Sequence, residues 1–275
     1  MALHKPLGRM TQTSAALRTR LLWQLDRLFP PDPTARMAAD EQTEHEVLKA
    51  SGSMGRYLNA LHRTDVDVLD FGCGWGGETL WLAERVRSVA GVDVEAHSVE
   101  QARNALAASG RTNCRFERSV DGRLPFPDAS FDAVFSTDVF EHVMDLDQAF
   151  HEIFRVLRPG GRLLSRFGPL FRSPQGYHLY WVCQVPWAHL LFGLEPMLAL
   201  RHARSGGEPF EARDWGDMGL NGKRAADFLR AMRHAGFEMT RAEIVPVRGL
   251  TRLARLPVVG DLVIFGIDCD LRRPA

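Results

Sequence analysis

The sequence has few cysteines, no excess of charge of either sign and no long uninterrupted apolar run. Its 4 cysteines are scattered over 275 residues without a Cys-x-x-Cys pair. No disulfide framework is therefore predicted, and because no His, Cys or Asp cluster has the spacing of metal ligands, we expect no metal. Since 34 basic residues balance 34 acidic ones, no overall field attracts a polyanion, and we expect no nucleic-acid partner.

The N-terminus lacks the apolar segment and cleavage site of a secretory leader, which together with the scattered cysteines predicts a cytoplasmic location. The most apolar stretch, Leu179–Leu200, is interrupted by Gln184, Pro186 and Glu195. Polar and proline residues at these positions argue against an integral membrane span. We expect a covered or interfacial segment, and contact of this stretch with a membrane surface stays open.

Residues 11–63 have a helical pattern. Leucines at helical spacing predict a helix over Ala15–Leu28, which prolines end, and a second helix is expected over Thr43–His62. We predict that residues 1–63 form an N-terminal helical cap or an oligomer surface, which leaves a homodimer open.

After residue 63, short apolar runs alternate with helical patterns, as is typical of a parallel sheet built from strand–helix–strand units. The expected strands are Val66–Phe71, Ser88–Asp93, Cys114–Arg118, Phe131–Ser136, Gly161–Phe167, Phe237–Val245 and Leu262–Asp268. The expected helices are Glu78–Arg87, Ser98–Ala108, Asp147–Val156 and Lys223–Ala235. Residues 64–275 are thus predicted to form an α/β domain, with an insertion over residues 168–222 after the fifth strand.

The first predicted strand leads into a glycine-rich turn that opens a helix. Gly72, Gly74 and Gly76 let the backbone turn tightly and approach a ligand closely. Asp70, two residues before the first of these glycines, would repel a pyrophosphate on the turn, whereas S-adenosylmethionine carries cationic amino and sulfonium groups. The turn therefore favours S-adenosylmethionine and argues against a dehydrogenase that uses NAD.

The second predicted strand ends at Asp93, 19 residues after Gly74. A carboxylate at this strand tip can accept hydrogen bonds from both hydroxyls of an adenosine ribose. We therefore predict a ribose contact for Asp93.

Four ordered motifs resemble those of the class I S-adenosylmethionine-dependent methyltransferases, in particular the type 11 group that acts on small molecules. The motifs are Val66–Gly77, Gly91–Val94, Leu124–Val134 and Phe154–Leu163. The resemblance covers about Val66–Phe167, with a weaker echo in Leu220–Phe237. It implies a Rossmann-like, seven-stranded sheet that is mostly parallel, with the last strand antiparallel and helices on both faces.

The resemblance also implies where the cofactor contacts lie. The glycine turn would border the methionine moiety, the tip of the second strand the ribose, and the stretch before Leu124 the adenine. Ser119–Gly122 stand where the family often has Gly-Asp-Ala, so either Asp121 or a backbone group supplies the adenine contact. The implied cofactor contacts are Asp70, Gly72, Cys73, Gly74, Gly76, Asp93, Val94, Asp121, Gly122, Thr137 and His142.

Methyl transfer from an activated donor requires alignment and exclusion of water, and a general base only for some acceptors. The candidate catalytic residues are His178, His142, His189 and Tyr177. For each histidine, a purely structural role is the competing interpretation.

We expect methylation of a small, partly apolar molecule of secondary or cell-envelope metabolism at an oxygen atom. The Asn/Asp-Pro-Pro-Tyr signature of amine and amide methylation is absent after the fourth strand, and aromatic residues are frequent in the insertion. Two alternatives stay open: methylation of carbon or nitrogen in an isoprenoid or polyketide-type metabolite, and a non-catalytic regulatory module that binds S-adenosylmethionine.

Overall fold

The computed structural model describes residues 8–30, 52, 54–62, 64–179, 181–205, 210–257 and 259–275. The chain divides into two compact units. The first contains residues 1–36, 169–222 and 246–265, and the second contains residues 37–168, 223–245 and 266–275. Part of the predicted helix Thr43–His62 lies outside the described residues, and its described end at residues 54–61 is helical.

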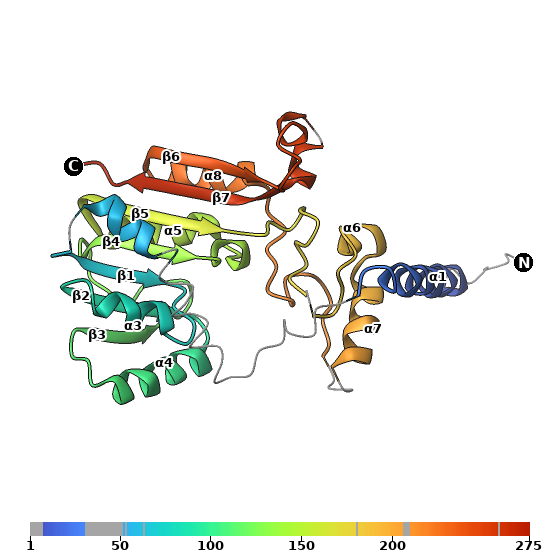
Figure 1. Cartoon of the computed structure of the whole chain (residues 1–275), viewed down its shortest axis with the longest axis horizontal. Coiled ribbons are helices and arrows are strands. Elements are labelled where there is room, and N and C mark those ends of the chain that lie inside the picture. Colours follow the sequence, from blue (N-terminus) through green and yellow to red (C-terminus); the bar gives the residue numbers. More distant parts are fainter. Residues whose placement is uncertain are drawn as a thin grey trace, which may run out of the picture. The chain divides into compact units, whose positions relative to one another are not determined.

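The second unit is built on a seven-stranded sheet with the order β3-β2-β1-β4-β5-β7-β6 (Figure 1). The strands are β1 Asp67–Phe71, β2 Ser88–Asp93, β3 Cys114–Arg118, β4 Phe131–Thr137, β5 Leu157–Phe167, β6 Glu238–Pro246 and β7 Ile264–Arg272. Strands β1 to β5 pair in parallel, whereas β7 is antiparallel to β5. The predicted mostly parallel sheet with an antiparallel last strand is confirmed.

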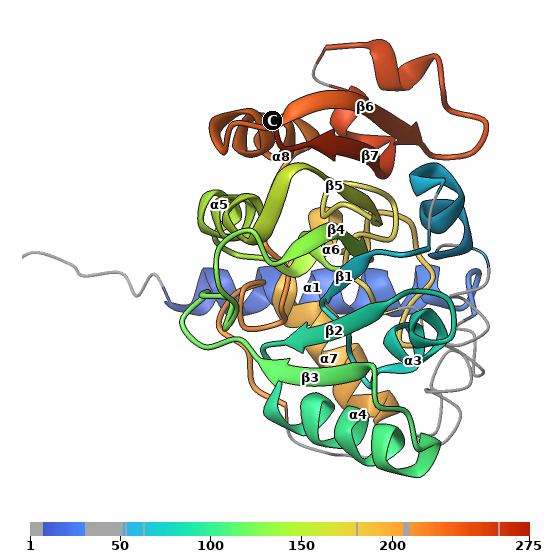
Figure 2. The same ribbon diagram turned by 90° about the vertical axis from the view of Figure 1, so that its left-hand side faces the viewer.

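Helices cover both faces of this sheet. They are α3 Gly77–Ala83, α4 Ala96–Ser109, α5 Leu146–Val156 and α8 Ala225–His234, and a 3₁₀ turn, η2, spans Phe140–His142. Helix α3 and the helical residues 54–61 lie on one face, and α5 and α8 lie on the other (Figure 2). Met54 and Tyr57 are buried in one core with Val68, Val89 and Phe135. The sequence predicts an N-terminal cap over residues 1–63, but residues 54–61 pack into the core of the sheet unit.

Strand β5 begins at Leu157, four residues before the predicted start. Leu157 pairs with Phe131, and the register then shifts before Arg162 pairs with Ala133. The Arg158–Gly161 segment, which contains a proline and two glycines, is accommodated by this irregularity at the start of the strand.

The first unit contains α1 Gly8–Asp26, α6 Ala188–Phe192, α7 Leu194–Arg204, and the short turns η3 Leu253–Arg255 and η4 Gly260–Leu262. Its core joins Leu22 of α1 to Val182 and Leu200. Asp26 is buried and forms an ion pair with Arg204. This pair links α1 to the end of α7.

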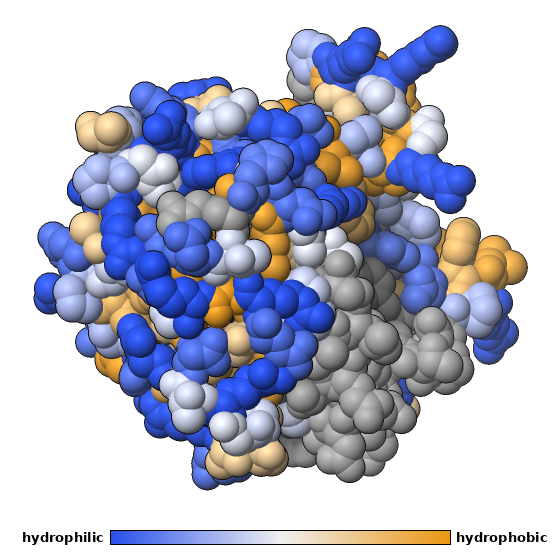
Figure 3. Space-filling model, turned by 60° about the vertical axis from the view of Figure 1, so that its left-hand side comes forward, coloured by the Kyte–Doolittle hydropathy of each residue, from blue (hydrophilic) through white to orange (hydrophobic). Residues whose placement is uncertain are grey.

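The apolar stretch Leu179–Leu200 supplies most of the core of the first unit, because the larger apolar side chains that the structure describes in it, other than Leu190 and Leu191, are largely covered. No helix among the described residues combines the length and the apolar character needed to cross a bilayer. On the face shown in Figure 3, hydrophilic side chains predominate and apolar ones are exposed only in small groups.

Candidate cofactor-binding site

The glycine-rich turn after β1 is held against β2. The amides of Gly72 and Cys73 both donate to the carbonyl of Val92, at 2.8 and 3.0 Å. Gly72 has a φ of 80°, and a Cβ on it would lie 2.3 Å from Cγ2 of Val139. Only glycine fits this position without strain and a steric clash. Gly76, also left-handed, then caps the start of α3.

Asp93, at the carboxyl end of β2, organises this turn. One carboxylate oxygen accepts from the amide of Gly74 at 3.0 Å, and the other accepts from the amide of Glu95 at 2.9 Å. The side chain is half-buried. Since a carboxylate has about four acceptor positions, each oxygen retains one for a ligand hydroxyl. Asp93 can therefore accept two further hydrogen bonds, one from each of the two hydroxyls of an adenosine ribose.

Asp70, near the end of β1, lies beneath the turn and is only 1% exposed. The hydroxyl of Thr79 in α3 donates to its carboxylate at 2.6 Å. A buried carboxylate favours a cation above the turn and disfavours a pyrophosphate, because charges interact strongly where water is excluded. This is the electrostatic preference that the sequence predicted.

The loop after β3 is hydrogen-bonded to the carboxyl end of β2. The amide of Ser119 donates to the carbonyl of Asp93 at 2.9 Å, and the guanidinium of Arg118 donates to the carbonyl of Val94 at 3.0 Å. Val94 is 59% exposed, which leaves an apolar surface beside Asp93. The predicted ribose and adenine segments are thereby brought together.

Asp121 and Gly122 form a left-handed turn in the same loop, with φ values of 53° and 71°. The side-chain amide of Gln148 in α5 donates to the carbonyl of Asp121 at 2.8 Å. The carboxylate of Asp121 is on an exposed residue, so it is accessible to a ligand amine.

Thr137 ends β4, and Tyr57 approaches it from the helical residues 54–61. The two hydroxyl oxygens are buried, and neither has a hydrogen-bond partner of good geometry among the described residues. Burial raises the pKa of Tyr57 above its ordinary value, and nearby Thr137 partly opposes this rise. Thr137 is thus the polar partner of the buried Tyr57 hydroxyl, and the pair lies at the carboxyl end of β4. Tyr57 is not among the predicted site residues, because its spacing in the sequence is that of an ordinary core residue.

Comparison with known proteins agrees with this geometry. A family model described as a methyltransferase domain matches residues 69–165, which contain the glycine turn, Asp93 and the end of β4. Residues 69–165 form a class I S-adenosylmethionine-dependent methyltransferase domain. The cofactor of such a domain is S-adenosylmethionine, and the acceptor positions of Asp93 fit it.

Relatives of this methyltransferase domain are found in bacteria and fungi. Methyltransferase GfsG of Streptomyces halstedii is 39% identical over 98 residues, which are 35% of this chain and 35% of that protein. O-methyltransferase resE of Aspergillus sclerotiorum is 28% identical over 163 residues, which are 52% of this chain and 57% of that protein. The chain thus spans only about a third to just over half of the length of these curated relatives.

The fold extends over more of the chain than the sequence similarity does. A putative sarcosine dimethylglycine methyltransferase from Galdieria sulphuraria superimposes with a TM-score of 0.55 at 13% identity, covering 94% of this chain and 98% of that one. This likeness shows a common fold.

The methyltransferase domain contains one of the four candidate catalytic residues. His142 ends η2, directly after β4, and is exposed. The other three candidates, His178, His189 and Tyr177, belong to the first unit.

Within the first unit, Tyr177 and His189 have surroundings typical of structural residues. The hydroxyl of Tyr177 is buried and donates to the carbonyl of Cys183 at 2.9 Å. His189 is buried against the rings of Phe171 and Trp215 and bonds to the carbonyl of Phe171. Burial lowers the pKa of His189 to about 4, so its ring is neutral at pH 7.

His178 is less buried than these two residues. Its Nε2 lies 2.8 Å from the carbonyl of Pro169, and its φ is 54°. A carbonyl partner requires a proton on Nε2, which leaves Nδ1 as the acceptor in the neutral ring.

Proposed function

We propose that this chain uses S-adenosylmethionine to methylate a small, partly apolar molecule at an oxygen atom. The observation that supports this most directly is Asp93, whose carboxylate is positioned by two backbone amides and still has acceptor positions for a ribose diol. Asp70 beneath the same turn adds the negative charge that a sulfonium cofactor favours.

The residues of the chain mainly bind and orient. When bound, the cofactor supplies an electrophilic methyl group, so the protein needs to align the acceptor and exclude water. The amides of Gly72 and Cys73 keep the turn in place against β2. His142, exposed next to the end of β4, is proposed to take the proton from an acceptor hydroxyl as a general base.

Two features support oxygen as the acceptor atom. The end of β4 has the sequence Thr137-Asp138-Val139-Phe140, which differs from the Asn/Asp-Pro-Pro-Tyr of amine and amide methylation. In addition, resE, which matches about half of this chain, is an O-methyltransferase. Both point to a hydroxyl acceptor, and we extend them to this chain as part of the proposal.

We also keep the remaining sequence predictions as proposals. Of the predicted cap residues 1–63 and 168–222, those other than residues 54–61 would lie over the acceptor. His178 would contact the acceptor, and the chain would act in the cytoplasm on a small-molecule substrate without a nucleic-acid partner. A homodimer through the N-terminal helices stays open.

The first test is calorimetric titration with S-adenosylhomocysteine, with NAD as the control ligand. Micromolar binding of S-adenosylhomocysteine and none of NAD is expected. The second test incubates the protein with methyl-labelled S-adenosylmethionine and a panel of phenols, alcohols, amines and isoprenoid quinones, and then locates the label by mass spectrometry. Label on oxygen supports the proposal, and label on carbon or nitrogen would replace it with the first alternative. Tight binding without turnover on any acceptor would favour the regulatory module.

A further inference from the structure

Helix α1 of the first unit has an exposed leucine stripe on the side that faces away from its core. Leu17, Leu21 and Leu25 follow one another at intervals of four residues and are 59%, 45% and 37% exposed. Ala15 and Leu22 are buried, and the helical repeat places them on an adjoining side of the helix. Residues four apart lie on the same side of a helix, so the three leucines form one continuous apolar stripe.

Arginines flank this stripe. From the helical repeat, Arg20 lies along one edge of the stripe and Arg18 along the other, and both are exposed. Arg27, in the turn that follows α1, is exposed as well. The one acidic residue in the sequence of α1, Asp26, is buried and paired with Arg204. Over residues 15–27, where the structure describes the side chains, the exposed charges are therefore all cationic and lie beside an apolar stripe.

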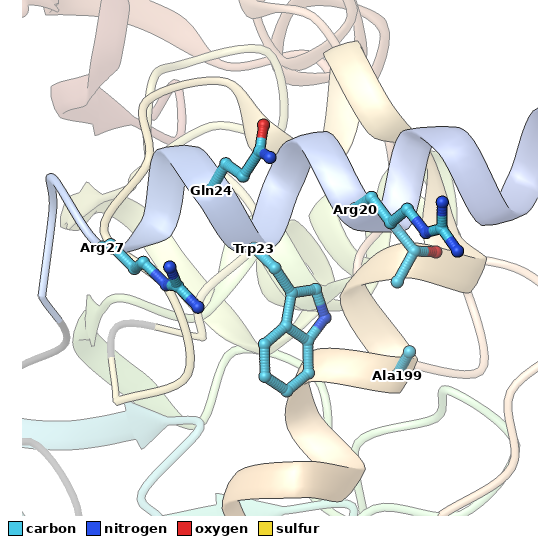
Figure 4. Close-up of a pocket in the computed structure, with 6 residues that line it drawn as sticks. Arg20, Trp23, Gln24, Arg27 and Ala199 are labelled. Atoms are coloured by element: carbon cyan, nitrogen blue, oxygen red, sulfur yellow. The ribbon is translucent and has the colours of Figure 1, made fainter.

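The helical repeat places Trp23 on the side of α1 away from the leucine stripe, next to α7. Its indole lies between the guanidinium groups of Arg20 and Arg27 (Figure 4). These residues, together with Thr19, Gln24 and Ala199 of α7, line an open groove of about 470 Å³. Trp23 is therefore not part of the stripe, whereas arginine side chains at the edges of a stripe are favoured where an apolar phase meets water, because each combines an apolar stem with a charged group.

We propose that α1 is a docking helix that lies on the surface of an anionic phospholipid bilayer. The leucine stripe would enter the boundary between headgroups and acyl chains, and Arg18, Arg20 and Arg27 would contact lipid phosphates. This interaction surface differs from the stretch Leu179–Leu200, whose larger side chains mostly form the core of the unit.

The positive charge of α1 favours an anionic bilayer over a second copy of the chain as its binding partner. A symmetric dimer brings the same patch of both copies together. Two such helices would place arginines against arginines, and α1 exposes no acidic side chain in the part that the structure describes. An anionic bilayer has the complementary charge.

The test is co-sedimentation of the full chain with vesicles of phosphatidylcholine alone or of phosphatidylcholine mixed with phosphatidylglycerol. Binding is expected only to the mixed vesicles, and it should weaken as the salt concentration rises. The triple variant R18Q/R20Q/R27Q should lower the partition coefficient by about 100-fold, because each arginine contributes roughly fivefold. The variant L21Q/L25Q should lower it by about tenfold or more.

Matched controls separate α1 from general surface effects. R85Q/R213Q/R230Q removes the same number of charges elsewhere, and L253Q/L256Q replaces two other exposed leucines of the first unit. Both controls should partition like the wild type, and all variants should retain their unfolding temperature and S-adenosylhomocysteine affinity.

Three outcomes would overturn the proposal. One is that the wild type does not bind the mixed vesicles. Another is that the control arginine variant loses as much binding as the α1 variant. The third is a dimer, detected by light scattering, that L21Q/L25Q converts to a monomer.

Discussion

Replacing Asp93 tests the cofactor site most directly. With alanine at this position, a bound ribose loses two hydrogen bonds to a charged acceptor, each worth about 1.5–3 kcal/mol. The loss of about 3–6 kcal/mol would weaken the affinity for S-adenosylhomocysteine by more than 100-fold. Asp93→Asn keeps one acceptor oxygen without the charge, so a loss of about 10- to 100-fold is expected.

The same substitution has a separate structural cost. The amides of Gly74 and Glu95 would lose their acceptor, which should lower the free energy of unfolding by about 1–2 kcal/mol without ligand. Calorimetric titration measures the affinity, and thermal unfolding of the ligand-free protein measures the structural cost. Asp227→Ala is the matched control, because this carboxylate also accepts from a backbone amide, at the start of α8. It should lose stability and keep the affinity. An Asp93→Ala protein that binds within about threefold of the wild type would refute the ribose assignment.

Three further substitutions have distinct expected results. Gly72→Ala should lower the free energy of unfolding by about 2–5 kcal/mol, because alanine is strained in this left-handed backbone conformation and its Cβ meets Val139. Val139→Ala in the same chain should recover part of this loss. No recovery would contradict the steric explanation. His189→Gln should flatten the dependence of stability on pH. The folded pKa of about 4 lies below the unfolded value near 6.5, so protonation of His189 lowers the free energy of unfolding of the wild type by about 3 kcal/mol as pH falls from 6.5 to 4. Denaturant melts at both pH values, monitored by tryptophan fluorescence, should show a smaller loss in the variant. Asp67→Asn should lower the free energy of unfolding by about 1–2 kcal/mol, because the ion pair with Arg87 holds the pKa of the Asp67 carboxyl well below its usual range. Cofactor affinity, measured in parallel, should not change. A large loss of affinity would show that this end of β1 affects the site.

Local patterns encode the parts of the fold that the sequence predicted well. Strand β2 has the predicted bounds, since a short apolar run between helical patterns can form little other than a buried parallel strand. The same holds for β3. The glycine turn was recognisable because left-handed backbone and close packing both require glycine. Asp93 was identified because its distance along the chain from that turn is set by one strand–helix–strand unit.

Contacts between distant segments were not predictable in this way. Tyr57 and Thr137 are 80 positions apart, and only the packing of one helix on the sheet brings their hydroxyls together. His189 has the sequence context of an available base, but the rings around it exclude water and lower its pKa. The charge state of a side chain depends on how far water is excluded from it, and a local sequence pattern does not indicate this.

The sequence by itself determined the sheet, the order of its helices and strands, the glycine turn and the carboxylates that favour S-adenosylmethionine, because these follow from hydrophobic periodicity and from backbone conformations that few residues adopt. Only the tertiary structure decided that α1 packs with Val182 and Leu200 in a unit of its own, and that Arg204 neutralises Asp26. It also decided which leucines of α1 stay exposed. Burial and ion pairing here arise from segments that are 178 residues apart in the sequence. Hydrophobic periodicity identifies an apolar face without specifying what it packs against.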